Sequence, residues 1–218
     1  MTKSPHTWPL AGAHDLISKR SIAKTRDESD ARILDRVLQG ASEALFAILL
    51  DSTHATAPPA HVPALWDERL VPLCAPKAPV VSIWYDGSLP AGAVPTLTDL
   101  TGMVRAIVEG LYLDAHEVAV AIVLLESLVV RRGHVVRPFS VRPVLLAACI
   151  VTLKLTRDVD TKTTQCVECM AECFTALTPR LGALIERQLL EYLDWLIPND
   201  PAVYERVLAL PSEDIPSN

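Results

Sequence analysis

The stretch Pro143-Val-Leu-Leu-Ala-Ala-Cys-Ile-Val-Thr-Leu153 is apolar along nearly its whole length and ends in one charged residue, Lys154. A helix that is apolar on nearly every face cannot lie on a protein surface, so other helices must surround it. An amphipathic helix follows from about Pro179 to Trp195, and it carries Glu186. We therefore expect a helical domain with a lysine and a glutamate at the edge of its core.

Helix caps, among them the capping-box spacing of Asp114-Ala-His-Glu117, and apolar residues at helical spacing predict five helices between residues 97 and 197. The third of them is the apolar stretch described above, and we expect it to be the most buried. A further apolar stripe predicts an N-terminal helix over residues 29–51, and residues 201–210 predict a short C-terminal helix. Because no segment after residue 97 alternates polar and apolar residues with period two, the sequence predicts an all-α fold.

Composition divides the chain into segments. Residues 1–28 are polar and mixed in charge, so we expect a flexible tail before the helix at 29–51. Residues 52–96 hold eight of the 17 prolines, which excludes one regular helix and indicates a linker or an irregular wrap. The main folded unit is predicted over residues 97–210, and residues 211–218 form a short tail. Whether residues 52–96 are ordered stays open.

Charge and hydropathy bound the classes of function. A formal net charge of −6 argues against a nucleic-acid partner. The longest apolar runs, at 118–125 and 144–153, are shorter than the ~20 residues that a membrane helix needs. The first residues contain no apolar segment typical of a secretory signal, and five cysteines fit free thiols in a reducing compartment. We expect a cytoplasmic or nuclear protein.

No motif predicts that the chain catalyses a reaction. The sequence contains no phosphate-binding loop, nucleophile elbow or dinucleotide-binding glycine motif, and no two acids stand out as a catalytic pair. Cys166, Cys169 and Cys173 would share one helix face, but three thiols are too few for a closed zinc site unless Cys149 or a histidine joins them. We favour a place in the core for these thiols, and we expect neither a metal nor a cofactor.

Three segments resemble parts of the cyclin box. Met103-Val-Arg-Ala-Ile-Val108 resembles the first-helix motif of cyclins, and residues 145–154 resemble the third-helix motif Leu-Leu-Ala-Ala-x-x-x-Ala-x-Lys. Residues 186–195, followed by Pro201-Ala-Val-Tyr204, are similar to the fifth helix and exit of P/U-type cyclins and cyclin Y. The resemblance covers about residues 97–210. It implies a single five-helix cyclin box with an extra N-terminal helix and a short C-terminal helix.

The resemblance implies a non-catalytic regulatory subunit that binds and activates a cyclin-dependent protein kinase. In cyclins, the third-helix lysine and the fifth-helix glutamate bind backbone groups around the kinase C helix, and these positions match Lys154 and Glu186. Leu155, Leu190 and Ile197 match the apolar neighbours that keep water from competing for those bonds. A surface that grips the C helix favours the active arrangement of the kinase. Which kinase and which process are involved, in the cell cycle or elsewhere, stays open.

The same alignment implies an internal ion pair and a change on the surface. The first-helix arginine of cyclins pairs with an acid of the second helix, which implies a buried pair between Arg105 and Glu126. Loss of such a pair costs roughly 3–5 kcal/mol. The substrate-docking positions of cell-cycle cyclins match Val104, Val108 and Leu111, which form a shallower patch without a tryptophan and argue against substrate docking there.

Two other interpretations remain open. One is a cyclin-fold scaffold without kinase binding, which fits the replacement of the acids after the third-helix lysine by Leu155-Thr-Arg157. The other is a transcription-related interaction protein with the same fold. Transcription factors of this kind have two boxes and a basic DNA-facing surface, whereas this chain shows one box and is acidic.

Overall fold

The computed structural model describes residues 28–54, 63–74, 95–132, 136–157 and 161–197. Within these ranges the chain forms six α-helices and one 3-10 helix, with no β-strand, which confirms the all-α prediction. The elements are α2 (Glu28–His54), η1 (Ala64–Trp66), α3 (Leu97–Leu111), α4 (Ala115–Arg132), α5 (Val141–Thr156), α6 (Thr163–Cys169) and α7 (Pro179–Tyr192).

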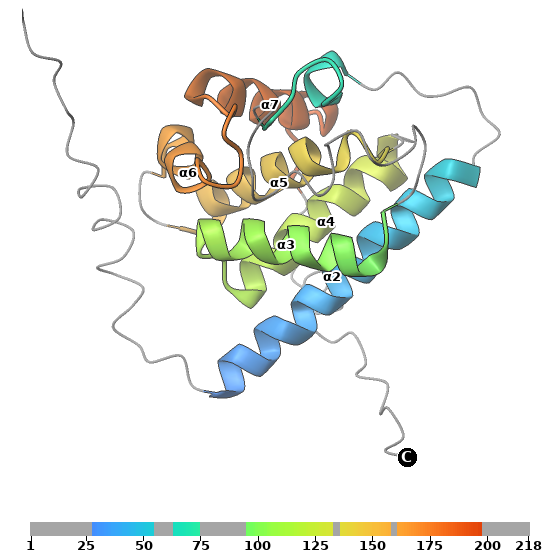
Figure 1. The fold of residues 1–218 in the computed structure, drawn as a ribbon, viewed down its shortest axis with the longest axis vertical. Coiled ribbons are helices and arrows are strands. Elements are labelled where there is room, and N and C mark those ends of the chain that lie inside the picture. Colours follow the sequence, from blue (N-terminus) through green and yellow to red (C-terminus); the bar gives the residue numbers. More distant parts are fainter. Residues whose placement is uncertain (1–27, 55–62, 75–94, 133–135, 158–160, 198–218) are drawn as a thin grey trace, which may run out of the picture.

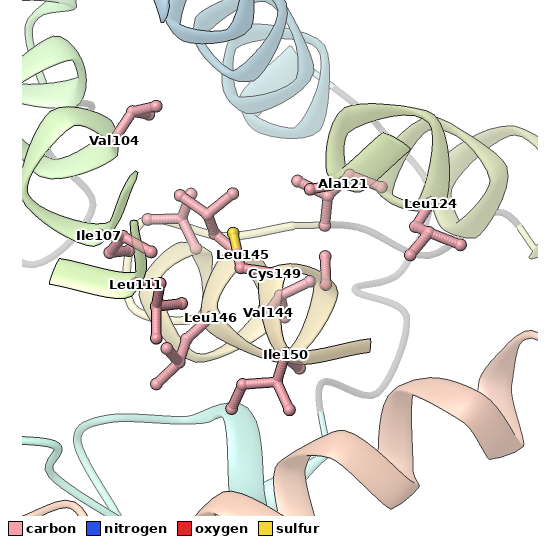
Figure 2. Packing of buried hydrophobic residues seen from close by; sticks show 14 of the residues in the cluster. Val104, Ile107, Leu111, Ala121, Leu124, Val144, Leu145, Leu146, Cys149 and Ile150 are labelled. Atoms are coloured by element: carbon pink, nitrogen blue, oxygen red, sulfur yellow. The ribbon is translucent and has the colours of Figure 1, made fainter. Parts of the chain in front are cut away.

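Helix α5 is the centre of the bundle. Every residue from Val141 to Leu153 is buried, so the prediction of a most-buried third helix is confirmed. Figure 1 shows α4 on one side of α5 and α7 on the other. Apolar side chains leave α5 in several directions, as Figure 2 shows for Leu145, Cys149 and Ile150. Burying one side chain of this size contributes roughly 1.5–3 kcal/mol, which is why an apolar sequence without an amphipathic face takes the central place.

The helix ends follow local capping chemistry. Thr96 caps α3, and its backbone N–H in turn donates to Asp99 in a capping box. Asp114 and Glu117 form the corresponding box before α4, as the sequence predicts: the Glu117 N–H donates to Asp114 Oδ1 at 2.8 Å, and the Asp114 N–H donates to Glu117 Oε2 at 2.9 Å. Thr178 caps α7 by accepting from the Leu181 N–H. These bonds satisfy N–H groups that a helix start leaves without partners.

The N-terminal helix lies across α3 and α4. Helix α2 includes the helix expected over residues 29–51 and extends it at both ends. Its first turns continue past α3 in Figure 1, and the Ile33 side chain there is exposed. The buried face of α2 is mostly apolar, and its buried apolar residues are Val37, Leu38, Ala41, Leu45 and Leu49.

Part of the proline-rich region is packed on the bundle. We call residues 63–74 the strap; it contains η1 and contacts α5 and α7. Trp66 is buried, and its ring centroid lies 5.2 Å from that of Tyr192. Leu73 is buried, and its carbonyl accepts from the Ala176 N–H at 2.9 Å. A wrap that proline keeps irregular is therefore a fixed part of the surface in this stretch.

Several predicted segments lie outside the described residues. These are most of the N-terminal tail, residues 55–62 and 75–94 of the proline-rich region, the C-terminal helix over 201–210 and the tail over 211–218. Among the helices that are described, none is both long enough and apolar enough to cross a membrane.

Candidate partner-binding site at the ends of α5 and α7

The structure brings together the lysine of α5 and the glutamate of α7. Lys154 Nζ lies 2.6 Å from Glu186 Oε1, although the two residues are 32 positions apart. Thr163, at the start of α6, joins both: its hydroxyl accepts from Lys154 Nζ at 2.8 Å and donates to Glu186 Oε2 at 2.6 Å. The Lys154 side chain is 33% exposed and that of Glu186 is 11% exposed, so a partner can reach the lysine.

Local sequence explains why these two charges meet. Lys154 is the first charged residue after the buried run that ends at Leu153, and it lies in the last turn of α5. A cation is favoured there because helix carbonyls point toward that end. Glu186 follows the fully buried Ile185 on α7, and α7 packs directly against α5. The packing of two apolar faces therefore leaves the charged pair at the rim of the core.

The predicted apolar neighbours differ in exposure. Leu155 is 47% exposed, whereas Leu190 and Ile197 are partly buried against the core. The sequence analysis missed Trp195 and Leu196, which are exposed in the turn after α7. Trp195 has a positive φ of 60°, a backbone conformation that residues other than glycine rarely adopt. The spacing of apolar residues in the sequence does not reveal it.

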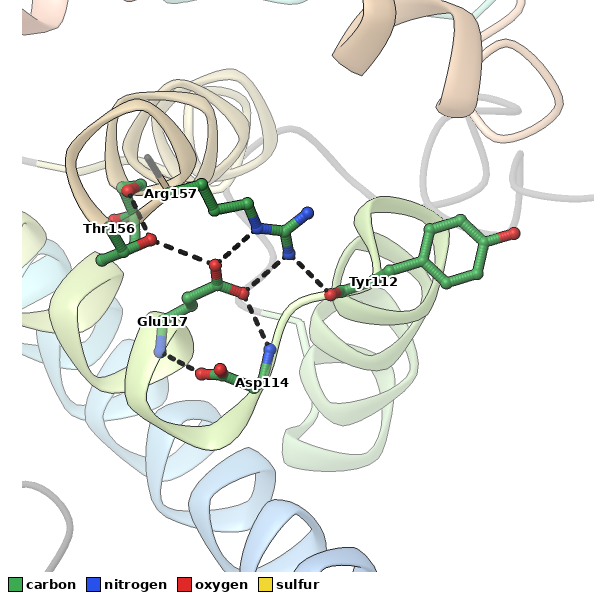
Figure 3. A network of polar contacts seen from close by, with 6 residues as sticks. Tyr112, Asp114, Glu117, Thr156 and Arg157 are labelled. Atoms are coloured by element: carbon green, nitrogen blue, oxygen red, sulfur yellow. Dashed lines mark hydrogen bonds and ion pairs between the residues drawn. The ribbon is translucent and has the colours of Figure 1, made fainter. Parts of the chain in front are cut away.

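A polar network fixes the end of α5 to the turn between α3 and α4 (Figure 3). Arg157 Nε donates to Glu117 Oε1 at 2.7 Å, and its Nη2 donates to Glu117 Oε2 at 2.9 Å and to the Tyr112 carbonyl at 2.8 Å. The Thr156 hydroxyl lies 3.0 Å from Glu117 Oε1. Arg157, which follows Lys154 by three residues, therefore pairs with a carboxylate of the protein itself.

This network also sets the protonation of Glu117. Its side chain is only 5% exposed. Desolvation is the largest single influence and raises the pKa of this carboxyl, but the bonds from Arg157, the Asp114 backbone and Thr156 together outweigh it and lower the pKa below its ordinary value. Glu117 is thus a buried carboxylate held in its charged form.

The predicted buried pair between Arg105 and Glu126 is wrong. The Arg105 side chain is 46% exposed and forms an ion pair of 2.9 Å with Asp35 of α2, and Glu126 is exposed. The reason is the orientation of α3, which turns its apolar stripe toward the core and Arg105 away from it. That stripe consists of Leu100, Met103, Val104, Ile107, Val108 and Leu111, so it includes all three positions compared above with a substrate-docking patch.

The cysteine cluster does not continue along one helix face. Helix α6 ends at Cys169, so Cys173 lies in the following turns, where its carbonyl accepts from the Cys74 thiol at 3.5 Å. Cys166 is buried, and burial raises the pKa of its thiol to about 11. Cys166 packs as a small apolar side chain in the core, and Cys169 and Cys173 are half-buried against it.

Comparison of the chain with protein-family models, curated proteins and solved structures finds no match. The candidate site therefore rests on the contacts described above. Its central features are one partly exposed charged pair, one bridging hydroxyl and an exposed leucine beside the lysine.

Proposed function

We propose that this chain is a single-box cyclin that binds and activates a cyclin-dependent protein kinase through Lys154 and Glu186. The observation that carries this proposal is the meeting of these two residues at one partly exposed place. They come from α5 and α7, the third and fifth of the five helices that the described residues form from Leu97 onward. The resemblance drawn from sequence pairs the same two positions at the kinase-binding surface.

The chemistry of the pair suits recognition of polypeptide backbone. A lysine ammonium donates to carbonyl oxygens, and a carboxylate accepts from N–H groups, so together they read both polar groups of a peptide unit. Hydrogen bonds to charged groups are the stronger kind, especially where apolar neighbours exclude water. Leu155 directly follows Lys154 and is exposed, so it would be such an apolar neighbour when a partner is bound.

Activation follows if the surface binds one arrangement of the kinase better than the others. Kinases need the C-helix glutamate paired with the catalytic lysine of the kinase. A partner shifts such an equilibrium only by its difference in affinity for the two arrangements. The proposed binding face is held by α5 and α7, which pack directly against each other, so it can favour the one arrangement that fits it.

The test is binding and activity with a panel of purified cyclin-dependent kinases. The variant carries Lys154→Ala with Glu186→Ala, and the matched control carries Arg187→Ala with Glu191→Ala, which removes an exposed ion pair on the same helix α7. We expect the site variant to lose at least about tenfold in affinity, because truncation of paired charges in an interface costs 2 kcal/mol or more. The control is expected to bind and activate like wild type.

Each result decides between the interpretations. Binding that survives the Lys154 and Glu186 substitutions would place the interface elsewhere. Binding without a rise in kinase activity would make the chain a holding subunit and not an activator. Absence of binding to every kinase in the panel would favour the cyclin-fold scaffold, while salt-dependent DNA binding would favour the transcription-related protein.

A further inference from the structure

The hydroxyl of Thr163 bonds to both charged residues of the candidate site. It accepts from Lys154 Nζ at 2.8 Å and donates to Glu186 Oε2 at 2.6 Å, while Lys154 Nζ also bonds directly to Glu186 Oε1 at 2.6 Å. The three side chains come from α5, α6 and α7 and form a closed ring of hydrogen bonds. A hydroxyl both donates and accepts, so one threonine satisfies an ammonium and a carboxylate together.

The start of α6 leaves this hydroxyl available for the charged pair. Threonine near a helix start often uses its oxygen to cap backbone N–H groups. Here Gln165 closes the start of α6 by accepting from the Lys162 N–H at 3.1 Å. The Thr163 hydroxyl instead faces α5 and α7 and bonds across the helix junction.

Close packing between α6 and α7 places Thr163 within reach. A Cβ built on Gly182 of α7 would lie 3.2 Å from Thr163 Cγ2 and 2.6 Å from Val167 Cγ2. The second distance is shorter than real Cβ contacts, so α6 sits against α7 where only glycine leaves room. The backbone positions of α6 and α7 therefore place the Thr163 side chain close to α7.

We propose that Thr163 is a positioning residue, which holds Lys154 and Glu186 in the orientation that the partner reads. The inference rests on the proposed function. The ring uses two of the three N–H bonds of Lys154, and each Glu186 oxygen, which has two lone pairs, accepts one bond. One donor and further acceptor positions thus remain for a partner's backbone. Holding long side chains in place before binding removes part of the entropy cost of association.

The test compares three variants of the full chain. Thr163→Val keeps the shape and removes the hydroxyl, Thr163→Ser keeps the hydroxyl, and Thr164→Val is the matched control at the exposed neighbouring position. The first readout is the NMR order parameter of the Lys154 ammonium group in the free protein. The second is the affinity for the kinase that wild type binds. Equal melting temperatures of the variants show that the fold is intact.

We expect only Thr163→Val to lower the order parameter and to weaken binding by about tenfold, which corresponds to about 1.4 kcal/mol, because two long side chains must then be ordered on association. In the background of Lys154→Ala with Glu186→Ala, the same substitution should change affinity no further. If Thr163 were merely structural, Thr163→Val would lower the melting temperature instead. Thr163→Ser would then not differ selectively from Thr163→Val in affinity.

The results that would overturn the role of Thr163 differ from the result that would overturn the proposed function. An unchanged Lys154 order parameter in Thr163→Val overturns the positioning role, whatever happens to binding. A lowered order parameter with unchanged affinity overturns the role of Thr163 in partner recognition. If wild type binds no kinase while the order parameter still falls, the proposed function fails and Thr163 remains the residue that orients the pair.

Discussion

Glu68 of the strap and Arg142 of α5 form an ion pair in which each side chain is only 2% exposed. Arg142 Nε donates to both Glu68 oxygens at 2.9 Å, and its Nη2 contacts Oε2 as well. The guanidinium carbon also lies 6.0 Å from the centre of the Phe174 ring. This pair joins positions 74 apart in the sequence and fixes the proline-rich strap to the most buried helix.

Removing one member of this pair should strongly destabilise the protein. We expect Glu68→Ala to lower the free energy of unfolding by about 3–5 kcal/mol, because it removes the carboxylate that pairs with the buried Arg142 guanidinium. Replacing both residues by leucine should recover most of that loss. Urea unfolding measures both, with Arg187→Ala, at an exposed pair, as a control expected to cost less than about 1 kcal/mol. A loss below about 1 kcal/mol in Glu68→Ala would show that this ion pair contributes little to the stability of the fold.

Two acids of α4 should contribute very differently to stability. Glu117 is buried and bonded to Arg157, whereas Glu126 is exposed. We expect Glu117→Ala to cost about 3–5 kcal/mol, because it leaves the partly buried Arg157 without its carboxylate. Glu126→Ala should change stability by about 0.5 kcal/mol or less. Thermal or urea unfolding of the two variants decides; equal losses would show that this assignment of the buried acid is wrong.

The lowered pKa of Glu117 predicts a specific dependence of stability on pH. A carboxyl whose pKa is lower in the folded state than in the unfolded chain stabilises the fold above its unfolded value, here about 4.5. That contribution falls as the pH drops through the lowered folded pKa. The difference in unfolding free energy between wild type and Glu117→Gln should therefore be largest near neutral pH and shrink below pH 4.5. A difference that is constant between pH 7 and pH 3 would argue against it.

The fold was predictable where its cause is local. The capping box at Asp114 and Glu117 and the buried run before Lys154 are patterns within a few residues, and both appear in the structure. The strap was not predictable, because Glu68 meets Arg142 from 74 positions away and proline spacing says only what a segment cannot form. Long-range contacts of single side chains leave no periodic pattern in one sequence.

The errors at α3 have a different origin. Its apolar residues recur at helical spacing and place Arg105 on the opposite face, so periodicity alone indicates an exposed arginine. The resemblance to cyclins instead implied a buried arginine. At the candidate site, the resemblance named Lys154 and Glu186, which do meet, but it contained no signal for Thr163, because a hydroxyl that bridges two charges is visible only in three dimensions.

Glycines at two helix positions should respond oppositely to alanine. At Gly102 of α3 an added Cβ meets no atom within 4 Å, so Gly102→Ala should stabilise the protein by about 0.5–1 kcal/mol through helix propensity. At Gly182 the added Cβ would meet Val167 Cγ2 at 2.6 Å. Val167 is buried and its branched side chain has few alternative rotamers, so α6 must move away from α7.

We therefore expect Gly182→Ala to cost about 1–3 kcal/mol from overpacking, less the gain in helix propensity, and to disturb the Thr163 bridge. Urea unfolding gives the first effect, and the NMR order parameter of the Lys154 ammonium gives the second. Gly102→Ala serves as the control that changes propensity alone. If Gly182→Ala stabilises the protein as Gly102→Ala does, α6 is not packed against α7 closely enough to hold Thr163 in the site.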